Sequence, residues 1–230
     1  MQLPEMLNFA LSIIASVIAT IICVVCASVV SKKARAVITV GYSKIIGVDV
    51  EEVFLNKKES APDIEQELKK AKWIKLFTGR GNELQRGEFA EILSGKQAIA
   101  LEFFHIIMPS TKIELGQFDW IKYREKELAV VDTIYRNPNT LRMQIESNVK
   151  YLAAPISAHI VTLRRYNMPH LYRILLTDRV AYLTPYTQHN HGRATETIKF
   201  RGGPMYQHLL RTFDVIWIAS LEEDAGHNDN

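Results

Sequence analysis

The stretch WIKLFTGRGN, residues 73–82, decides the fold of this 230-residue chain. Its first five residues form a short apolar run that predicts a β-strand, and the glycines that follow predict a tight turn. Leu84, Phe89 and Ile92 then recur at helical spacing. A strand, a glycine loop and a helix in succession indicate an α/β domain.

Around this stretch the chain offers more strands and helices. Residues 101–108 are apolar on both faces and stop at a proline, which is typical of a central strand that is covered on both sides. The patterns predict helices at residues 60–71, 118–135, 141–152 and 204–220, and strands at residues 158–165, 171–177, 180–184 and 197–201. We therefore expect a mixed sheet covered by helices.

The N-terminal part predicts a membrane anchor. Residues 9–30 carry no charge and are followed by Lys32, Lys33 and Arg35. A helix of this length crosses a hydrocarbon core of about 30 Å. The preceding residues include Glu5 but no lysine or arginine, unlike a cleaved signal peptide. Because basic residues gather on the cytoplasmic side, we expect a single-pass transmembrane helix in the inner membrane, with the C-terminal domain in the cytoplasm.

Small residues line one side of the predicted anchor. In lipid, close packing and hydroxyl hydrogen bonds hold helices together, so this stripe predicts a homo-oligomer, although small residues are also common in membrane helices without such a role. The stripe consists of Ser12, Ser16, Ala19, Thr20 and Cys23. Both cysteines lie in the anchor, so neither a disulfide framework nor a cysteine zinc site is expected in the remainder.

Four segments follow from these patterns. They are the anchor at residues 1–35, a connector at 36–59, the α/β domain at 60–221 and an acidic, disordered tail at 222–230. The formal net charge of +3 is too small to indicate nucleic-acid binding by itself. The positions of the arginines are therefore more informative than their number.

Arg80 marks the first candidate site, because it stands in the glycine loop. Glycines free the backbone to turn its amides toward an anion at a helix start, and the guanidinium adds a forked donor. The alternative is an ordinary turn between strand and helix.

Arg164, Arg165, His170 and Arg173 form the second candidate site, on two predicted strands around a Met-Pro turn. Four neighbouring cations favour an anion site. The alternative is a solvated strand face whose charges pair with carboxylates of the helices.

His189, His191 and Arg193 form the third candidate site, in a polar loop. No carboxylate or cysteine accompanies the histidines closely, so we predict neither a metal site nor a cofactor. Arg193 with His191 makes a better anion contact, and a plain surface loop is the alternative.

Together these segments resemble a degenerate phospholipase D-like domain over residues 60–220. The resemblance is carried by the strand into Gly79-Arg80-Gly81, the strand with Pro109-Ser110, Arg124-Glu125 on a helix, and the segment from Pro169-His170 through Arg173 to Asp178. The family signature is His-x-Lys followed by Asp after four residues, present twice, and the resemblance implies histidines acting as nucleophile and general acid.

This chain departs from that signature. Arg173 replaces the lysine and Asp178 keeps the four-residue gap, but His170 precedes Arg173 by three residues instead of two. Since side chains alternate along a strand, this spacing predicts that the two point to opposite faces unless a bulge intervenes. His105, in an apolar strand, is expected to belong to the core. We therefore expect that catalysis is lost and that a phosphate-receiving pocket remains.

Two functions of different class follow. The first is a membrane-anchored sensor or effector that binds a nucleotide, another phosphate-bearing ligand or an operon-encoded partner protein. Its site residues are Arg80, Arg164, Arg173, His191 and Arg193, and prokaryotic antiphage defence modules provide the analogy. The second is a membrane-tethered phosphodiesterase or nuclease that uses His170 and Arg173, with Asp178 orienting them. An adaptor that recruits a partner through the helix at residues 118–135 is a third option.

Overall fold

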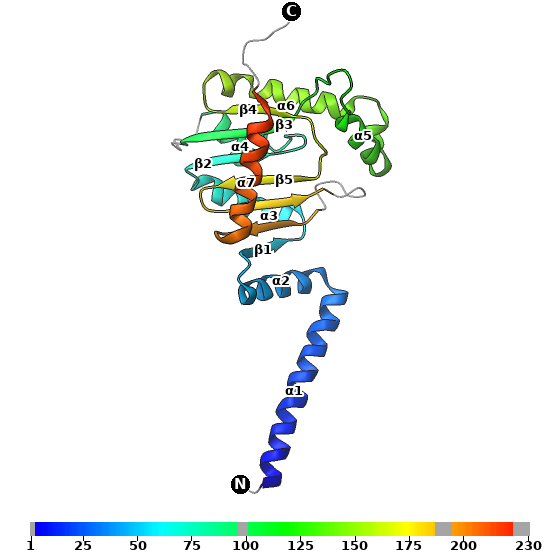
Figure 1. Cartoon of the computed structure of the whole chain (residues 1–230), viewed down its shortest axis with the longest axis vertical. Coiled ribbons are helices and arrows are strands. Elements are labelled where there is room, and N and C mark those ends of the chain that lie inside the picture. Colours follow the sequence, from blue (N-terminus) through cyan, green and yellow to red (C-terminus); the bar gives the residue numbers. More distant parts are fainter. Residues whose placement is uncertain (1–2, 96–100, 187–194, 223–230) are drawn as a thin grey trace, which may run out of the picture.

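The computed structural model describes residues 3–95, 101–186 and 195–222. Over these residues the chain forms an eight-stranded mixed sheet with the order β1-β7-β6-β5-β2-β3-β4-β8 (Figure 1). The helices are α1 (Leu3–Val30), α2 (Lys32–Ile46), α3 (Lys57–Lys69), α4 (Gly87–Leu93), α5 (Trp120–Val131), α6 (Thr140–Ser157) and α7 (Gly203–Ala219), with a 3₁₀ turn, η1 (Thr133–Arg136). The strands are β1 (Val50–Phe54), β2 (Trp73–Phe77), β3 (Phe103–Pro109), β4 (Thr162–Tyr166), β5 (Tyr172–Thr177), β6 (Ala181–Pro185), β7 (Thr197–Phe200) and β8 (Leu221–Glu222).

The centre of the sheet combines two kinds of pairing. β2, β3 and β4 run parallel to one another, whereas β5, β6 and β7 form an antiparallel meander that joins β2 through β5. The predicted mixed sheet with covering helices is confirmed, because each predicted strand becomes a strand of its interior.

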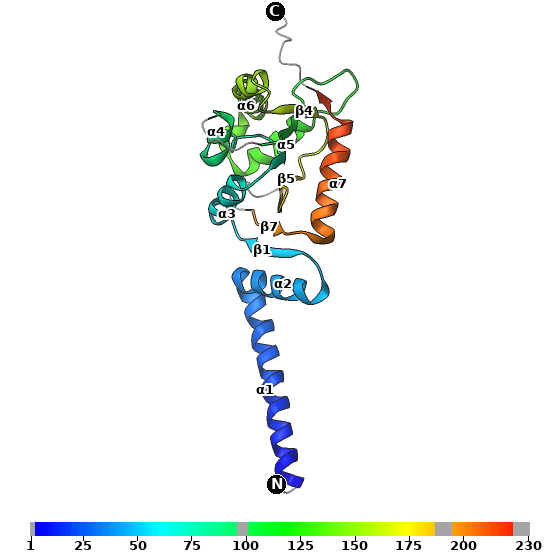
Figure 2. The same ribbon diagram turned by 90° about the vertical axis from the view of Figure 1, so that its left-hand side faces the viewer.

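Helices cover both faces of the sheet, so neighbouring strand residues enter different cores. Leu76 and Ile106 pack toward α3, α4, α5 and α6, while Phe77 and Ile107 pack toward Phe213 of α7. Figure 2 shows α7 alone on one side and α3, α4 and α6 on the other. These strands are mostly apolar, with Lys75 in β2 and His105 in β3 as exceptions, because both faces of the sheet are covered.

The segment expected to be a connector contains regular structure. α2 occupies residues 32–46, and β1 pairs with β7, so the sheet begins at Val50. α3 begins at Lys57 rather than near Ser60, because the Asn56 side chain accepts from the backbone N–H groups of Lys58 and Glu59 and caps the helix there. At the other end, β8 pairs with β4, and residues 223–230 of the predicted tail lie outside the described residues.

A network of buried charges joins α3 to β6 and β7. The Lys199 ammonium lies 2.8 Å from Asp63 Oδ1 and 3.4 Å from Glu67 Oε1, and its residue is 3% exposed. The Tyr182 hydroxyl donates to Asp63, and Arg201 Nη2 lies 2.7 Å from Glu67 Oε1. The charge of the buried Lys199 ammonium is therefore balanced by carboxylates of α3.

Among the described residues, no helix combines the length and the hydrophobicity needed to cross a membrane.

Candidate functional site

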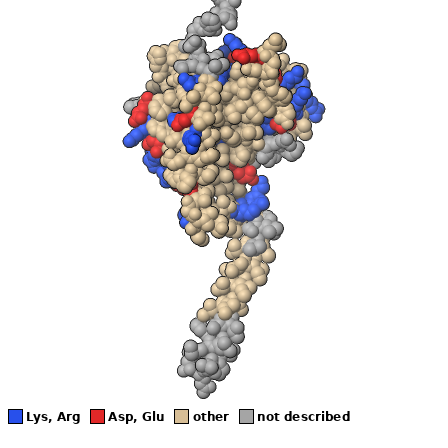
Figure 3. All heavy atoms as spheres, viewed as in Figure 1, with Lys and Arg blue, Asp and Glu red and all other residues tan. Residues whose placement is uncertain are grey.

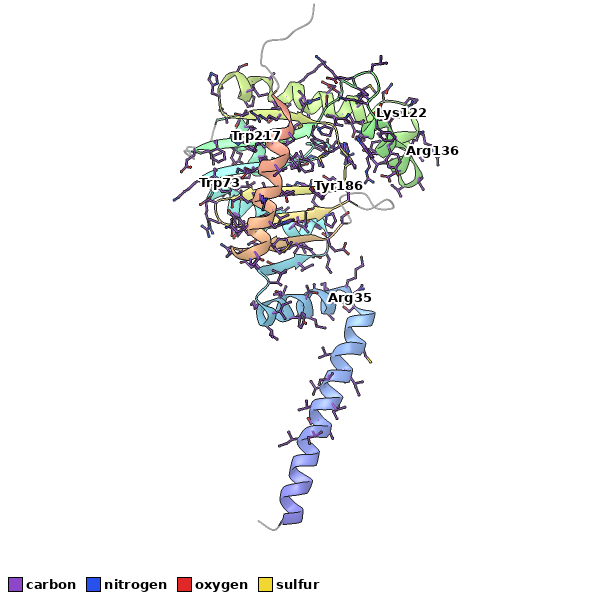
Figure 4. The ribbon with its side chains drawn as sticks, viewed as in Figure 1. Arg35, Trp73, Lys122, Arg136, Tyr186 and Trp217 are labelled. Atoms are coloured by element: carbon purple, nitrogen blue, oxygen red, sulfur yellow. The ribbon has the colours of Figure 1, made fainter. Side chains whose placement is uncertain are left out.

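A cavity of about 100 Å³ opens at the ends of the central strands, where β2 and β6 end and β5 and β7 begin. Strand ends from both directions meet there because β5 runs antiparallel to β2 and β6. Tyr186 follows β6 at this end of the strands, whereas Trp73 marks the opposite end of β2 (Figure 4). Helices α3, α5 and α6 close the cavity with Lys57, Arg124 and Leu141.

His170 reaches this cavity through a turn rather than from a strand. The Leu171 amide donates to the Pro169 carbonyl at 3.1 Å, and β5 begins only at Tyr172. The turn rotates His170 to the same side as Arg173, and both residues line the cavity. The prediction that their spacing places them on opposite faces is therefore wrong, because strand alternation does not extend to residue 170.

The His170 imidazole is shielded from solvent. The residue is 9% exposed, and its Nε2 has no hydrogen-bond partner among the described residues. Burial, and then the neighbouring Arg124 guanidinium, lower the pKa of His170 from about 6.5 to about 4. At neutral pH the ring is therefore uncharged, and Nε2 is available to a ligand.

Gly79 lets the glycine loop approach this imidazole. A Cβ at Gly79 would lie 3.3 Å from His170 Nδ1 and 3.2 Å from Tyr186 Cε2, so even an alanine side chain would press on both rings. Gly81 has φ +80°, and a Cβ there would lie 2.7 Å from Met108 Cε. The glycines thus permit close packing. The expectation that the glycine loop lies at the start of a helix is wrong, because α4 begins only at Gly87, beyond the loop.

Stability should depend on pH through His170. Its pKa is lower in the folded than in the unfolded chain, so stability is lost as pH falls from about 6.5 to about 4, where the unfolded chain binds more protons. The loss amounts to about 3 kcal/mol. Urea unfolding at several pH values should show this slope in the native protein and not in His170→Asn. An equal slope in both proteins would contradict the assignment.

A buried ion pair forms the floor of the cavity. Arg173 Nε lies 2.9 Å from Glu83 Oε1, and both side chains are nearly buried. Burial raises the pKa of Glu83, but Arg173, Lys57 and the Thr78 hydroxyl more than offset this and hold the pKa at about 2. Burial lowers the pKa of Lys57, while Glu83 raises it. Glu83 is thus an anion held between two cations.

Positive charge dominates the lining. Among the described residues that line the cavity, the basic ones are Lys57, Arg80, Arg86, Arg124 and Arg173, and the acidic one is Glu83. Arg80 donates to the Tyr135 hydroxyl and to the Gln144 amide oxygen. Arg124 lies 2.7 Å from Glu127 Oε2 and 5.9 Å from the centre of the Tyr186 ring. With His170 neutral, the lining carries a net positive charge that suits an anion.

The structure separates the other predicted site residues. Arg164 lies on the α7 face of the sheet, 4.6 Å from the Trp217 ring, and donates to the Trp217 carbonyl. Asp178 follows β5 at the opposite end of the strands, where it accepts from the Lys72 amide. His191 and Arg193 lie outside the described residues. Of the predicted ligand-binding residues that the structure describes, the cavity brings together Arg80 and Arg173.

The predicted oligomerisation residues all lie on α1. Ser12, Ser16, Ala19, Thr20 and Cys23 are exposed in the single chain, and the Thr20 hydroxyl donates to the Ser16 carbonyl at 2.8 Å. This contact lies within one helix. The self-association of α1 stays a prediction.

Sequence reasoning missed Lys57, Glu83, Arg86, Arg124 and Tyr186, all of which line the cavity. Arg124 had a recognisable signal. From the sequence it is placed only on a helix that contributes to the family resemblance, yet Ile121, Arg124 and Leu128 stand at helical spacing and all three are buried. A basic residue on the apolar face of a helix indicates a buried ion pair or an anion site.

No protein-family model matches the chain, and no curated protein matches its sequence. Nuc, a phospholipase D family member from Salmonella typhimurium, matches at TM-score 0.46 and 10% identity, over 75% of this chain and 96% of its own. NucT from Helicobacter pylori matches at TM-score 0.38 and 10% identity, over 75% and 98%. TrmBL2, an archaeal chromatin protein with a novel mode of DNA binding, matches at TM-score 0.45 and 10% identity, over 95% and 68%. Because these TM-scores are all below 0.5, the likeness assigns neither a reaction nor a ligand to this chain.

Proposed function

We propose that this protein is a membrane-anchored sensor or effector whose α/β domain binds a phosphate-bearing ligand in the cavity beside His170. The observation that carries the proposal is the lining, in which five basic side chains surround one carboxylate and a neutral imidazole. A phosphate group carries up to two negative charges near neutral pH and offers several acceptor oxygens. Such a group balances the positive charge of the lining that Glu83 and Glu127, the ion-pair partner of Arg124, leave uncompensated.

The size and the geometry of the cavity suit a single phosphate group. A volume of about 100 Å³ corresponds to roughly three waters. Guanidinium groups such as those of Arg124 and Arg173 bind phosphate through parallel N–H donors, and the buried setting strengthens these bonds. The remainder of a nucleotide or head group would extend out of the cavity.

The anchor, its orientation and its self-association belong to the same proposal. They are supported by the uncharged residues 9–30, by the basic residues that follow and by the small-residue stripe. The phospholipase D-like assignment is supported by the resemblance of residues 60–220 to that family. A role in antiphage defence and an operon-encoded partner are proposed by analogy with prokaryotic defence modules.

A second candidate function is phosphodiester cleavage, and the turn at His170 favours it. An uncharged imidazole beside Arg173 and Arg124 has the protonation state of a nucleophile next to a phosphate site. The reaction also needs a proton donor for the leaving oxygen. Among the described lining residues His170 is the only histidine, so binding without cleavage is the function that we favour.

The test is a thermal-shift and calorimetric titration of the full chain with inorganic phosphate, nucleotides, oligonucleotides and phospholipid head groups. Lys57→Met should weaken phosphate binding about tenfold, since it removes one charged donor from the cavity. Lys58→Met is the matched control, because Lys58 is exposed and lies outside the lining. Equal phosphate binding by both variants would show that the cavity is not the binding site.

Mass analysis of each incubation separates binding from cleavage. A ligand that is recovered unchanged supports a sensor. A product that forms with the native protein and not with His170→Asn establishes the phosphodiesterase instead.

A further inference from the structure

An apolar face of α2 has no partner within the domain. Val37, Ile38, Tyr42 and Ile45 recur at helical spacing, so they share one side of the helix. Val37 is 73% exposed and Ile45 is 82% exposed. A large exposed aliphatic stripe is costly in water and marks a contact surface.

The opposite side of α2 holds it to the domain. Ser43 is buried, and its hydroxyl lies 3.1 Å from the Val50 carbonyl of β1. At the start of the helix, Lys32 Nζ lies 3.1 Å from Glu196 Oε1. These two contacts fix which face of α2 meets the domain and which face turns away from it.

The apolar face turns toward the side on which α1 extends. Val24 of α1 and Val37 and Ile38 of α2 line one hollow in the angle between the two helices. α2 lies across the molecule, between the sheet and α1, in both views (Figures 1 and 2). If α1 enters a bilayer, the face with Val37 and Ile38 is the one that meets its surface.

The charge of α2 matches an anionic surface. Besides Lys32, which pairs with Glu196 of the domain, the helix contains Lys33, Arg35 and Lys44 and no acidic residue. Figure 3 shows basic side chains gathered where α1 meets α2, and Figure 4 places Arg35 at that corner. Long basic side chains at the edge of an apolar face can bury their stems and keep their charge among lipid head groups. Tyr42 adds the amphipathic ring that is typical of this depth.

We propose that α2 is an interfacial helix that lies flat on an anionic bilayer, with Val37, Ile38, Tyr42 and Ile45 inserted among the lipids. This inference rests on the membrane anchoring in the proposed function. It adds that the domain is held against the membrane surface at a fixed distance and orientation, because α2 is attached to both α1 and β1.

The test uses the full chain in lipid nanodiscs, with Cys23→Ala and Cys26→Ala as background. A nitroxide is placed on Ile45→Cys in the apolar face, on Thr39→Cys as an exposed position of the same helix outside that face, and on Ile18→Cys in α1. Collision with oxygen, which concentrates in lipid, is compared with collision with a water-soluble nickel chelate. The oxygen-to-nickel ratio should be several-fold higher at Ile18→Cys and Ile45→Cys than at Thr39→Cys.

The outcomes distinguish this inference from the anchor. A high ratio at Ile18→Cys with a low ratio at Ile45→Cys overturns the interfacial helix and leaves the anchor standing. Low ratios at both positions overturn the two together. Protection of Ile45→Cys from both reagents, with spin–spin broadening between copies, shows that a second chain covers the face and also overturns the inference.

The lipid composition tests whether the basic residues of α2 favour an anionic bilayer. The ratio at Ile45→Cys should rise when phosphatidylglycerol is added to phosphatidylcholine, because anionic lipid draws the lysines and arginine toward the surface. A ratio that does not change overturns the preference for an anionic bilayer.

Discussion

Glu83→Gln is expected to lower the free energy of unfolding by about 3–5 kcal/mol in phosphate-free buffer, since it removes the charge that compensates a buried arginine. Arg173 Nε lies 2.9 Å from the Glu83 carboxylate, and Lys57 also interacts with it. Glutamine keeps the size of the side chain, so the change isolates the charge. Urea unfolding followed by tryptophan fluorescence measures the effect.

Phosphate should restore part of this loss. A ligand that binds only the folded protein stabilises it by mass action, and without Glu83 the cavity repels an anion less. Added inorganic phosphate is therefore expected to raise the melting temperature of Glu83→Gln by more than that of the native protein. Glu196→Gln, which removes an exposed ion pair with Lys32, should change stability by less than about 1 kcal/mol. Similar behaviour of the two variants would show that Glu83 does not balance the cavity.

Lys199→Met is the second change with a large expected effect. The ammonium lies 2.8 Å from the partly exposed Asp63 and 3.4 Å from the buried Glu67. Its removal leaves Asp63 without this cation and leaves Glu67 with Arg201, which lies 2.7 Å away. Breaking a buried pair from one side costs about 3–5 kcal/mol. The loss is measured as a lower urea midpoint at an unchanged slope.

A double mutant separates charge from packing. Asp63→Asn combined with Lys199→Met removes both charges and leaves an amide oxygen that can still accept from the Tyr182 hydroxyl. We expect the double variant to be more stable than the sum of the single changes predicts, because the two groups interact directly. Simple additivity would mean that the network acts through packing alone.

Most of the sheet follows from its apolar runs. The predicted strand at residues 73–77 coincides with β2, and the helix predicted at residues 204–220 matches α7 closely. These elements face the core, so their patterns are periodic and strong. β1 was missed because two consecutive glutamates interrupt the apolar residues of its sequence, VEEVF. α2 was missed because residues 37–40 are β-branched and Gly41 follows them, and all of these residue types have low helix propensity.

The candidate site was less predictable, for two physical reasons. A turn at Pro169 ends the strand alternation, so the spacing of His170 and Arg173 misled the prediction of faces. The remaining cations come from α3, α5 and the glycine loop, which the fold brings to one end of the central strands. Contacts of this kind depend on topology, which local patterns do not encode. Arg164 stands beside Arg165 in the sequence and yet lies on the α7 face, whereas Arg165 Nη2 lies 3.2 Å from Glu146 of α6.

β1 closes one edge of the sheet with two consecutive glutamates. Glu52 is exposed, Glu51 lies 2.6 Å from Arg201, and α2 packs beside β1, so another chain that approached this edge would meet carboxylates and a helix instead of a free ladder of amides. If α1 gathers several copies in one patch of membrane, their sheets will meet at high local concentration without fusing edge to edge. The same strand that seats the domain on α2 thus protects crowded copies from aggregation.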